Sequence, residues 1–148
     1  MKQIIFSTEN NWIGLILRLV LGIIMLPHGA QKLFGLFGGY GFTGTVKYFT
    51  ETIKLPFIIA FLVIGIEFFC SVALIAGFGS RVCAILFIVI MTGAILTINY
   101  PNGFFMNWFG NQKGEGYEYH LLIIGICIAL LVTGSGKYSI DGLIAVNR

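Results

Sequence analysis

The sequence predicts an all-α fold: a four-helix transmembrane bundle with a short interfacial amphipathic helix between its first two spanning helices. Hydrophobic residues make up 57% of the 148 residues, charged residues only 10%, and the mean hydropathy is +0.94. Soluble domains are about half apolar and about one-quarter charged, so this composition indicates a membrane protein. The apolar residues form four runs, and we expect spanning helices over 12–34, 56–77, 82–99 and 117–133 within a single domain, residues 1–148.

The first apolar run carries four residues that are unusual inside a membrane: Arg18, Pro27, His28 and Lys32. A cation near the centre of a bilayer costs about 2.5–3.5 kcal/mol, so a helix that keeps one normally turns it toward a protein interior or a hydrated cavity. Pro27 lacks a backbone N–H and is expected to bend the helix just before His28. The first helix therefore needs neighbouring helices that receive its polar side chains.

The segment after the first span predicts a short helix at the membrane surface. Phe42, Val46, Phe49 and Ile53 recur at i, i+4, i+7 and i+11 while charged residues occupy another face, which is typical of an interfacial amphipathic helix. The preceding stretch, residues 39–44, formally matches GxGxxG, but a dinucleotide-binding fingerprint must follow a strand, and this one follows a spanning helix. We therefore exclude nucleotide binding.

The later connections differ in length and character. Residues 77–80 can form only a turn, so the second and third spans should run antiparallel. Residues 100–116 combine Tyr-Pro-Asn-Gly with an aromatic cluster of the kind found at bilayer surfaces. The tail, residues 134–148, is short and polar, and we assign it no chemistry.

Membrane depth predicts a deep ion pair. With a helix rise of about 1.5 Å per residue, and measured from the side of the long loops, Glu67 should lie about 16 Å deep and Arg18 about 21 Å deep. An arginine side chain spans this gap, so we expect an Arg18–Glu67 ion pair across the bundle. Such a pair can fix helix register, and the sequence leaves a structural and a functional role equally open.

Depth also predicts a second, shallower site, a polar pocket that opens toward the two long loops. Its residues would be His28, Lys32, Asn99, Tyr100, Asn102, Glu118 and His120. Histidine, lysine and glutamate in a half-dry setting suit proton relay or binding of the polar head of a lipid-soluble ligand such as a quinone. In the alternative interpretation, Lys32 and Glu118 only extend to lipid headgroups and each histidine caps a helix end.

Other chemistries find less support in the sequence. The three cysteines, Cys70, Cys83 and Cys127, lie in apolar runs without a CxxC or a metal-ligand spacing, so we expect buried, inert thiols and no metal site. Two histidines on different helices could ligate haem axially, an interpretation that ranks below quinone binding. No catalytic triad is visible. A net charge of +3, interrupted by apolar runs, argues against a nucleic-acid partner.

The residues with the most chemistry also carry a family resemblance. The motifs are RLVLGIIMLPHGAQKLF at 18–34, Glu67 in an apolar helix, PNGFF at 101–105, GYEY at 116–119 and GSGKYSID at 134–141. In this combination and order the sequence resembles the DoxX family of small bacterial and archaeal integral membrane proteins. The resemblance implies a four-helix membrane bundle and a redox setting, because some relatives are described as membrane subunits of thiosulfate:quinone oxidoreductase or as partners of terminal quinol oxidases. Ser135 stands where the family often has proline.

We therefore expect a multi-pass protein of the bacterial cytoplasmic membrane that acts as a small accessory subunit or binding module in quinone-linked redox metabolism. Membrane lipids, a quinone, a redox partner subunit and further copies of the chain are the expected partners. The alternative is a non-catalytic protein that binds lipid or assembles a membrane complex. A proton-coupled transporter is a third interpretation, least favoured because there are only four helices and no internal repeat.

Overall fold

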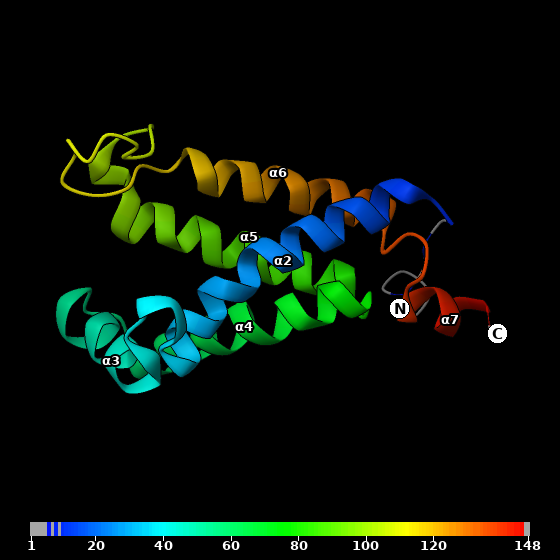
Figure 1. Ribbon diagram of the computed structural model, residues 1–148, viewed down its shortest axis with the longest axis horizontal. Coiled ribbons are helices and arrows are strands. Elements are labelled where there is room, and N and C mark those ends of the chain that lie inside the picture. The colour runs from blue at the N-terminus through cyan, green and yellow to red at the C-terminus, as the bar shows by residue number, and fades with distance from the viewer. Residues whose placement is uncertain (1–5, 7, 9, 147–148) are drawn as a thin grey trace.

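The chain folds into helices throughout. The computed structural model describes residues 6, 8 and 10–146, and no strand occurs among them (Figure 1). The helices are α2 (Trp12–Phe34), α3 (Gly41–Lys47), α4 (Phe57–Ala76), α5 (Ser80–Ala94), α6 (Glu118–Thr133) and α7 (Ile140–Val146). Single turns join them: η1 (Leu36–Gly38), η2 (Tyr48–Thr52), η3 (Ile95–Asn99) and η4 (Tyr100–Asn102), of which η2 and η3 are π-helical. The all-α prediction is confirmed.

Three helical stretches are long and apolar enough to cross a membrane. They are Trp12–Phe34, Phe57–Ala76 and Ser80–Asn102, the last of which joins α5 to η3 and η4. The fourth expected span, α6, is apolar but has 16 residues. Sixteen residues cover about 24 Å of a hydrocarbon core that is about 30 Å thick. The helices thus support a membrane protein, and α6 as a fourth span stays a prediction.

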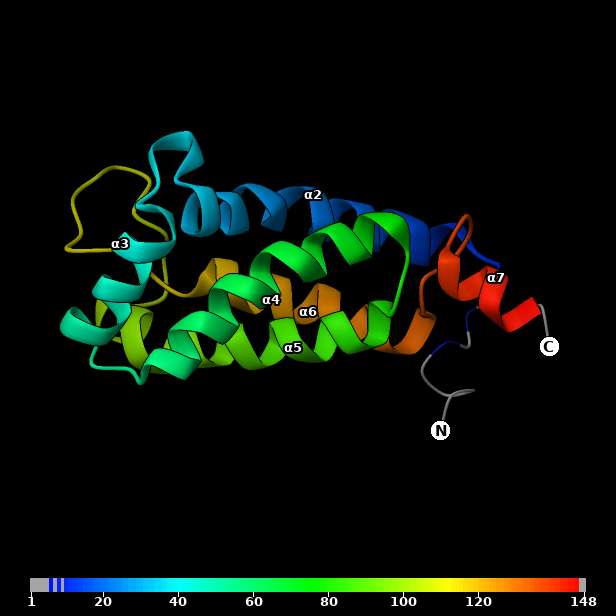
Figure 2. The ribbon, with the colours of Figure 1, turned by 90° about the horizontal axis from the view of Figure 1, so that it is seen from below.

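Caps and glycines set the ends of the long helices. The Asn11 side chain accepts a hydrogen bond from the Gly14 N–H at 2.7 Å and begins α2, which continues through Pro27 and ends at Gly35. Gly35 has a left-handed backbone conformation (φ 74°), which glycine adopts without strain. The short connection 77–79 returns the chain so that α4 and α5 run antiparallel, as predicted (Figure 2).

The predicted amphipathic segment between the first two spans is helical, as α3 followed by η2. Phe49 is buried, whereas Lys47 and Glu51 are exposed and form an ion pair of 3.9 Å. The segment packs on α2 and α4. Its place at a membrane interface stays a prediction.

Glycines set the register between α2 and α4. A Cβ atom added at Gly22 would lie 3.0 Å from the Ser71 carbonyl oxygen, and one at Gly29 would lie 2.6 Å from the Phe68 backbone nitrogen. Only residues without a side chain permit two helix backbones to approach so closely. On the other side of the bundle α5 packs against α6. The core between the helices includes Leu21, Met25, Leu74, Phe87, Ile123 and Leu130.

The two ends of the molecule differ. The long connections 35–56 and 103–117 lie at one end, which we call the loop end (Figures 1 and 2). The α4–α5 turn and α7 lie at the other, which we call the tail end.

The predicted Arg18–Glu67 pair is wrong, because the Arg18 side chain binds backbone carbonyls at the tail end. The residue is 1% exposed. Its guanidinium donates five hydrogen bonds of 2.6–3.1 Å to the backbone carbonyls of Leu74, Ile75, Ser135, Lys137 and Tyr138. The last carbonyls of a helix have no partner within it and carry partial negative charge, so a cation is stabilised at the end of α4. Arg18 thus ties the tail to that helix end.

A buried carboxylate holds the tail from the other direction. Asp141 accepts hydrogen bonds from the backbone N–H of Gly79 at 2.7 Å and of Ser80 at 3.1 Å, where α5 begins, and also from the Ser135 hydroxyl. An anion satisfies the free N–H groups at a helix N-terminus. The tail, for which the sequence predicts no chemistry, therefore binds both the end of α4 and the start of α5.

Candidate functional site

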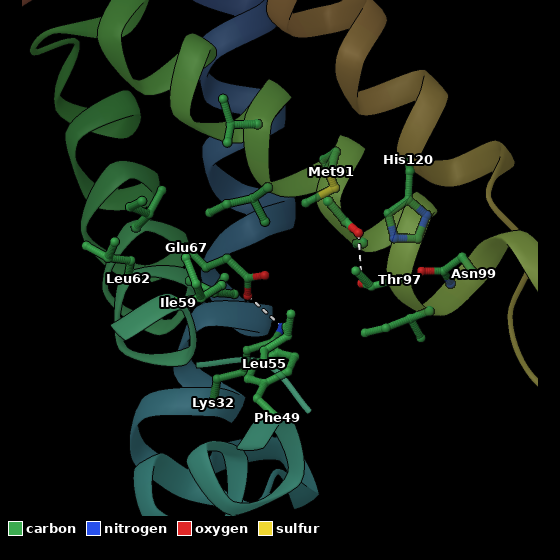
Figure 3. A pocket seen from close by; sticks show the side chains of 17 residues that line it. Lys32, Phe49, Leu55, Ile59, Leu62, Glu67, Met91, Thr97, Asn99 and His120 are labelled. Atoms are coloured by element: carbon green, nitrogen blue, oxygen red, sulfur yellow. Dashed lines mark hydrogen bonds and ion pairs between the residues drawn. The ribbon is translucent and has the colours of Figure 1, made fainter. Parts of the chain in front are cut away.

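A cavity of about 390 Å³ lies between α4 and α5 on the side of the loop end (Figure 3). Most of its lining is apolar, including Phe49, Leu55, Leu62, Val89 and Met91. Its polar side chains are Lys32, Glu67, Thr97, Asn99 and His120. A mostly apolar cavity with a few convergent polar groups is the usual form of a small-molecule site.

One wall of the cavity carries an ion pair. The Lys32 ammonium lies 2.6 Å from a carboxylate oxygen of Glu67, and Glu67 is 4% exposed. The close contact of Gly29 with the backbone at Glu67 and Phe68 brings the end of α2 beside the middle of α4. Lys32 follows Gly29 by almost one helical turn, so its side chain reaches Glu67. The pair therefore depends on the register of these two helices.

The opposite wall carries an amide and an imidazole (Figure 3). Asn99 is buried, and its amide donates a hydrogen bond of 2.9 Å to the Glu115 carbonyl. His120 lies in the first turn of α6, and its Nδ1 atom is buried with no hydrogen-bond partner among the described residues. A buried polar atom without a partner is costly, so Nδ1 is a natural position for a ligand contact.

Two π-helical turns border the cavity. Phe49 belongs to η2, and Thr97 and Asn99 belong to η3. The π-helix is rare and occurs often at functional sites. Here both examples place side chains on the same cavity.

The structure divides the predicted pocket. Lys32, Asn99 and His120 line the cavity, but the other four predicted residues do not. His28 is exposed, and its ring centroid lies 6.0 Å from that of Tyr119. Three of the seven predicted residues thus line this cavity and four do not, and a shared role of all seven in binding stays a prediction.

The remaining three predicted residues shape the loop end. Tyr100 is exposed and stacks on Tyr117 at 6.3 Å. Asn102 donates a hydrogen bond of 3.1 Å to the Glu115 carbonyl. Glu118 accepts a hydrogen bond of 2.9 Å from the Met106 N–H. These contacts hold the 103–117 connection in place.

Two features of the cavity were not predicted from the sequence: the pairing of Glu67 with Lys32, and the contribution of Phe49 and Leu55 to the lining. The sequence does contain a signal for the Lys32–Glu67 pair. A glycine inside a spanning helix indicates a close helix contact, and Lys32 lies about one turn beyond Gly29. The positions of Phe49 and Leu55 depend on how residues 41–55 fold back onto the bundle, and no comparable sequence pattern predicts this fold.

The cysteines and histidines form no candidate metal site among the described residues. No group of three or more His, Cys, Asp or Glu side chains that could hold a metal ion occurs in residues 6, 8 and 10–146. Cys70, Cys83 and Cys127 are buried free thiols, as the apolar runs predict. Of the two histidines, only His120 lines the cavity.

Comparison with known proteins places the chain in a family. The DoxX family model matches residues 13–100. A protein of Bacillus subtilis (strain 168) named "Putative oxidoreductase CatD" is 32% identical over 127 residues, which cover 86% of this chain and 83% of the relative. No solved structure matches the chain. The protein therefore belongs to the DoxX family, in agreement with the motifs found in its sequence.

Proposed function

We propose that this protein is a multi-pass protein of the bacterial cytoplasmic membrane, with α6 as its fourth span, and that it binds a quinone as an accessory subunit of quinone-linked redox metabolism. The observation that carries the proposal is the unpartnered Nδ1 atom of His120 in an apolar cavity that also contains the Lys32–Glu67 pair. The name of the Bacillus subtilis relative supports a redox role.

The arrangement of the polar groups suits a quinone ring. A para-quinone has two carbonyl oxygens on opposite sides of a flat ring, and each needs a hydrogen-bond donor. The Lys32 ammonium has three N–H donors, of which Glu67 takes one. His120 offers a second donor from the opposite wall when its Nδ1 carries the proton. One ring can therefore be held from both sides.

Charge favours a neutral head over a phosphate. The charges of Lys32 and Glu67 compensate each other, so the cavity offers no excess positive charge. An anionic phosphate in this apolar setting would lie near the Glu67 carboxylate without a counter-charge of its own. A quinone head carries no charge and avoids this cost.

The test is the quinone content of the purified protein. We expect extraction from the wild-type chain, isolated with native lipids, to release quinone in stoichiometric amount. His120→Leu should lower the affinity about tenfold, because loss of one hydrogen bond that leaves a partner unpaired costs about 1–3 kcal/mol. His28→Leu is the matched control, since His28 lies outside the cavity, and it should retain the quinone.

Two results would contradict the proposal. Wild-type protein that releases phospholipid but no quinone would favour the lipid-binding or assembly protein. Equal quinone content in the His28→Leu and His120→Leu variants would remove the cavity as the binding site. The redox role is measured separately, as the rate at which membranes with and without the protein reduce a short-tailed quinone.

A further inference from the structure

Gly93 is a glycine that packing does not require. It lies near the end of α5, and a Cβ atom added there would meet no other atom within 4 Å. Gly22 and Gly29 differ, because their Cβ atoms would collide with α4. Glycine weakens a helix relative to most other residues. Gly65 and Gly125 have equally open Cβ positions, but of these three helical glycines only Gly93 lines the cavity.

Gly93 borders the cavity where it reaches the outer surface. Val89 precedes it by one turn, lines the cavity and is 63% exposed. Across from them on α4, Ile59 and Leu62 also line the cavity and are exposed. These side chains are apolar and belong to spanning helices, so this surface faces lipid tails. In Figure 1, α4 and α5 diverge from their connection toward the loop end.

Side chains from the segment before α4 line the cavity on the side of the loop end. Phe49 is buried and lines the cavity together with Leu55. The Leu55 N–H donates a hydrogen bond of 2.9 Å to the Phe49 carbonyl, which fixes one beside the other. The side between α4 and α5 is bordered instead by the exposed apolar residues Ile59, Leu62 and Val89.

We propose that the ligand enters sideways from the bilayer between α4 and α5, and that Gly93 determines specificity by leaving this opening wide enough for a ring. The proposal rests on the proposed function, because the ring is that of the quinone. The ring would pass Gly93 to reach Lys32 and His120, and the apolar tail would stay in the lipid beside Leu62 and Val89. The ligand class is thus a ring-headed molecule with a long apolar tail.

The experiment compares glycine variants on two helices. Gly93→Leu should fill the opening, Gly93→Ala should narrow it, and Gly125→Leu is the matched control. Gly125 lies in α6, has no atom within 4 Å of its Cβ position and does not line the cavity. Quinone-depleted protein is placed in phosphatidylcholine vesicles that contain ubiquinone-10, and bound quinone is measured over time after the protein is recovered.

We expect the initial rate of quinone uptake to fall at least about tenfold in Gly93→Leu, to fall less in Gly93→Ala and to be unchanged in Gly125→Leu. Leucine is a better helix former than glycine, so the variants should fold. If Gly93→Leu does not fold, Val89→Trp replaces it in the experiment, because Val89 is exposed and a larger side chain there narrows the same opening.

The outcomes separate the two proposals. If the wild type and Gly93→Leu take up quinone at the same rate, access between α4 and α5 is refuted while quinone binding stands. If Gly125→Leu is slowed as much as Gly93→Leu, the effect is not local to the opening and the inference fails. If the wild type takes up no quinone, the proposed function fails and the inference with it.

Discussion

Replacing Arg18 by methionine tests whether the tail end stabilises the fold. Arg18 is buried, and its five hydrogen bonds join three segments that are far apart in sequence: α2, the end of α4 and the tail. Methionine keeps an unbranched apolar side chain but removes every N–H donor. The substitution therefore leaves the carbonyls of Leu74, Ile75, Ser135, Lys137 and Tyr138 without this partner.

The cost follows from the number of groups left unpaired. A buried polar group that loses its hydrogen-bond partner costs about 1–3 kcal/mol. Lys137 is partly exposed and Tyr138 is exposed, so water can reach some of the freed carbonyls. The Leu74 carbonyl keeps a hydrogen bond of 3.0 Å from the Gly77 N–H, whereas the Ser135 carbonyl belongs to a buried residue. We expect a loss of about 3–5 kcal/mol, the range found when a buried charged network is broken, and a melting temperature lower by about 10 °C.

The native cysteines provide the assay. Cys70, Cys83 and Cys127 are buried, so a maleimide dye that fluoresces on reaction with thiols reports unfolding in detergent. Arg81→Met is the matched control, because Arg81 is only partly buried and binds the Leu131 and Val132 carbonyls at the end of α6. Arg18→Met should melt well below Arg81→Met. Equal melting temperatures for the wild type and Arg18→Met would refute the stabilising role of these hydrogen bonds.

Three further substitutions test the contact between α2 and α4, the ion pair and the hydrogen bonds of Asp141. Gly29→Val should sharply reduce the yield of monodisperse protein in gel filtration, because its Cβ would collide with the Phe68 backbone, while Gly65→Val, at an open position, should not. Glu67→Gln should lower the melting temperature by leaving the Lys32 ammonium unpaired in the cavity, and adding Lys32→Met should restore part of the loss. Asp141→Asn should cost about 1–2 kcal/mol in thermal unfolding, because the N–H groups at the start of α5 lose a charged acceptor.

The positions of the helices followed from the sequence, but their relative register did not. Apolar runs and glycine punctuation predict the helix bounds to within a few residues, and the turn at 77–79 predicts the antiparallel α4 and α5. The estimate of membrane depth assumed that the ends of all four spans lie at the same level in the bilayer. The close contact at Gly29 instead brings the end of α2 beside the middle of α4. In this register Lys32 forms the ion pair with Glu67, and Arg18 lies at the C-terminal end of α4. A shift of this kind changes every predicted side-chain pair at once.

The tail shows a second limit of sequence reasoning. A short polar segment after the last apolar run has the composition of a solvated end. Gly136 of this segment is required by the fold, since its φ is 69° and a Cβ there would collide with the Leu15 backbone nitrogen. Only the fold shows that this backbone packs against the start of α2 and that the Ser135 hydroxyl binds Asp141. The contacts that stabilise the tail end are therefore long-range, and no local pattern predicts them.

The two cations of α2 have different surroundings and should have different roles. Arg18 is enclosed by carbonyls and borders no part of the cavity, whereas Lys32 lies about 21 Å further along the helix and faces open space with N–H donors that Glu67 does not use. A group enclosed by protein contributes to stability, and a group that faces a cavity can also meet a ligand. Melting temperature and quinone uptake should therefore vary independently: Arg18→Met should lower the first more than the second, and Gly93→Leu the second alone. Variants in which the two quantities fall together would show that the cavity depends on the tail end, and that the bundle behaves as one cooperative unit.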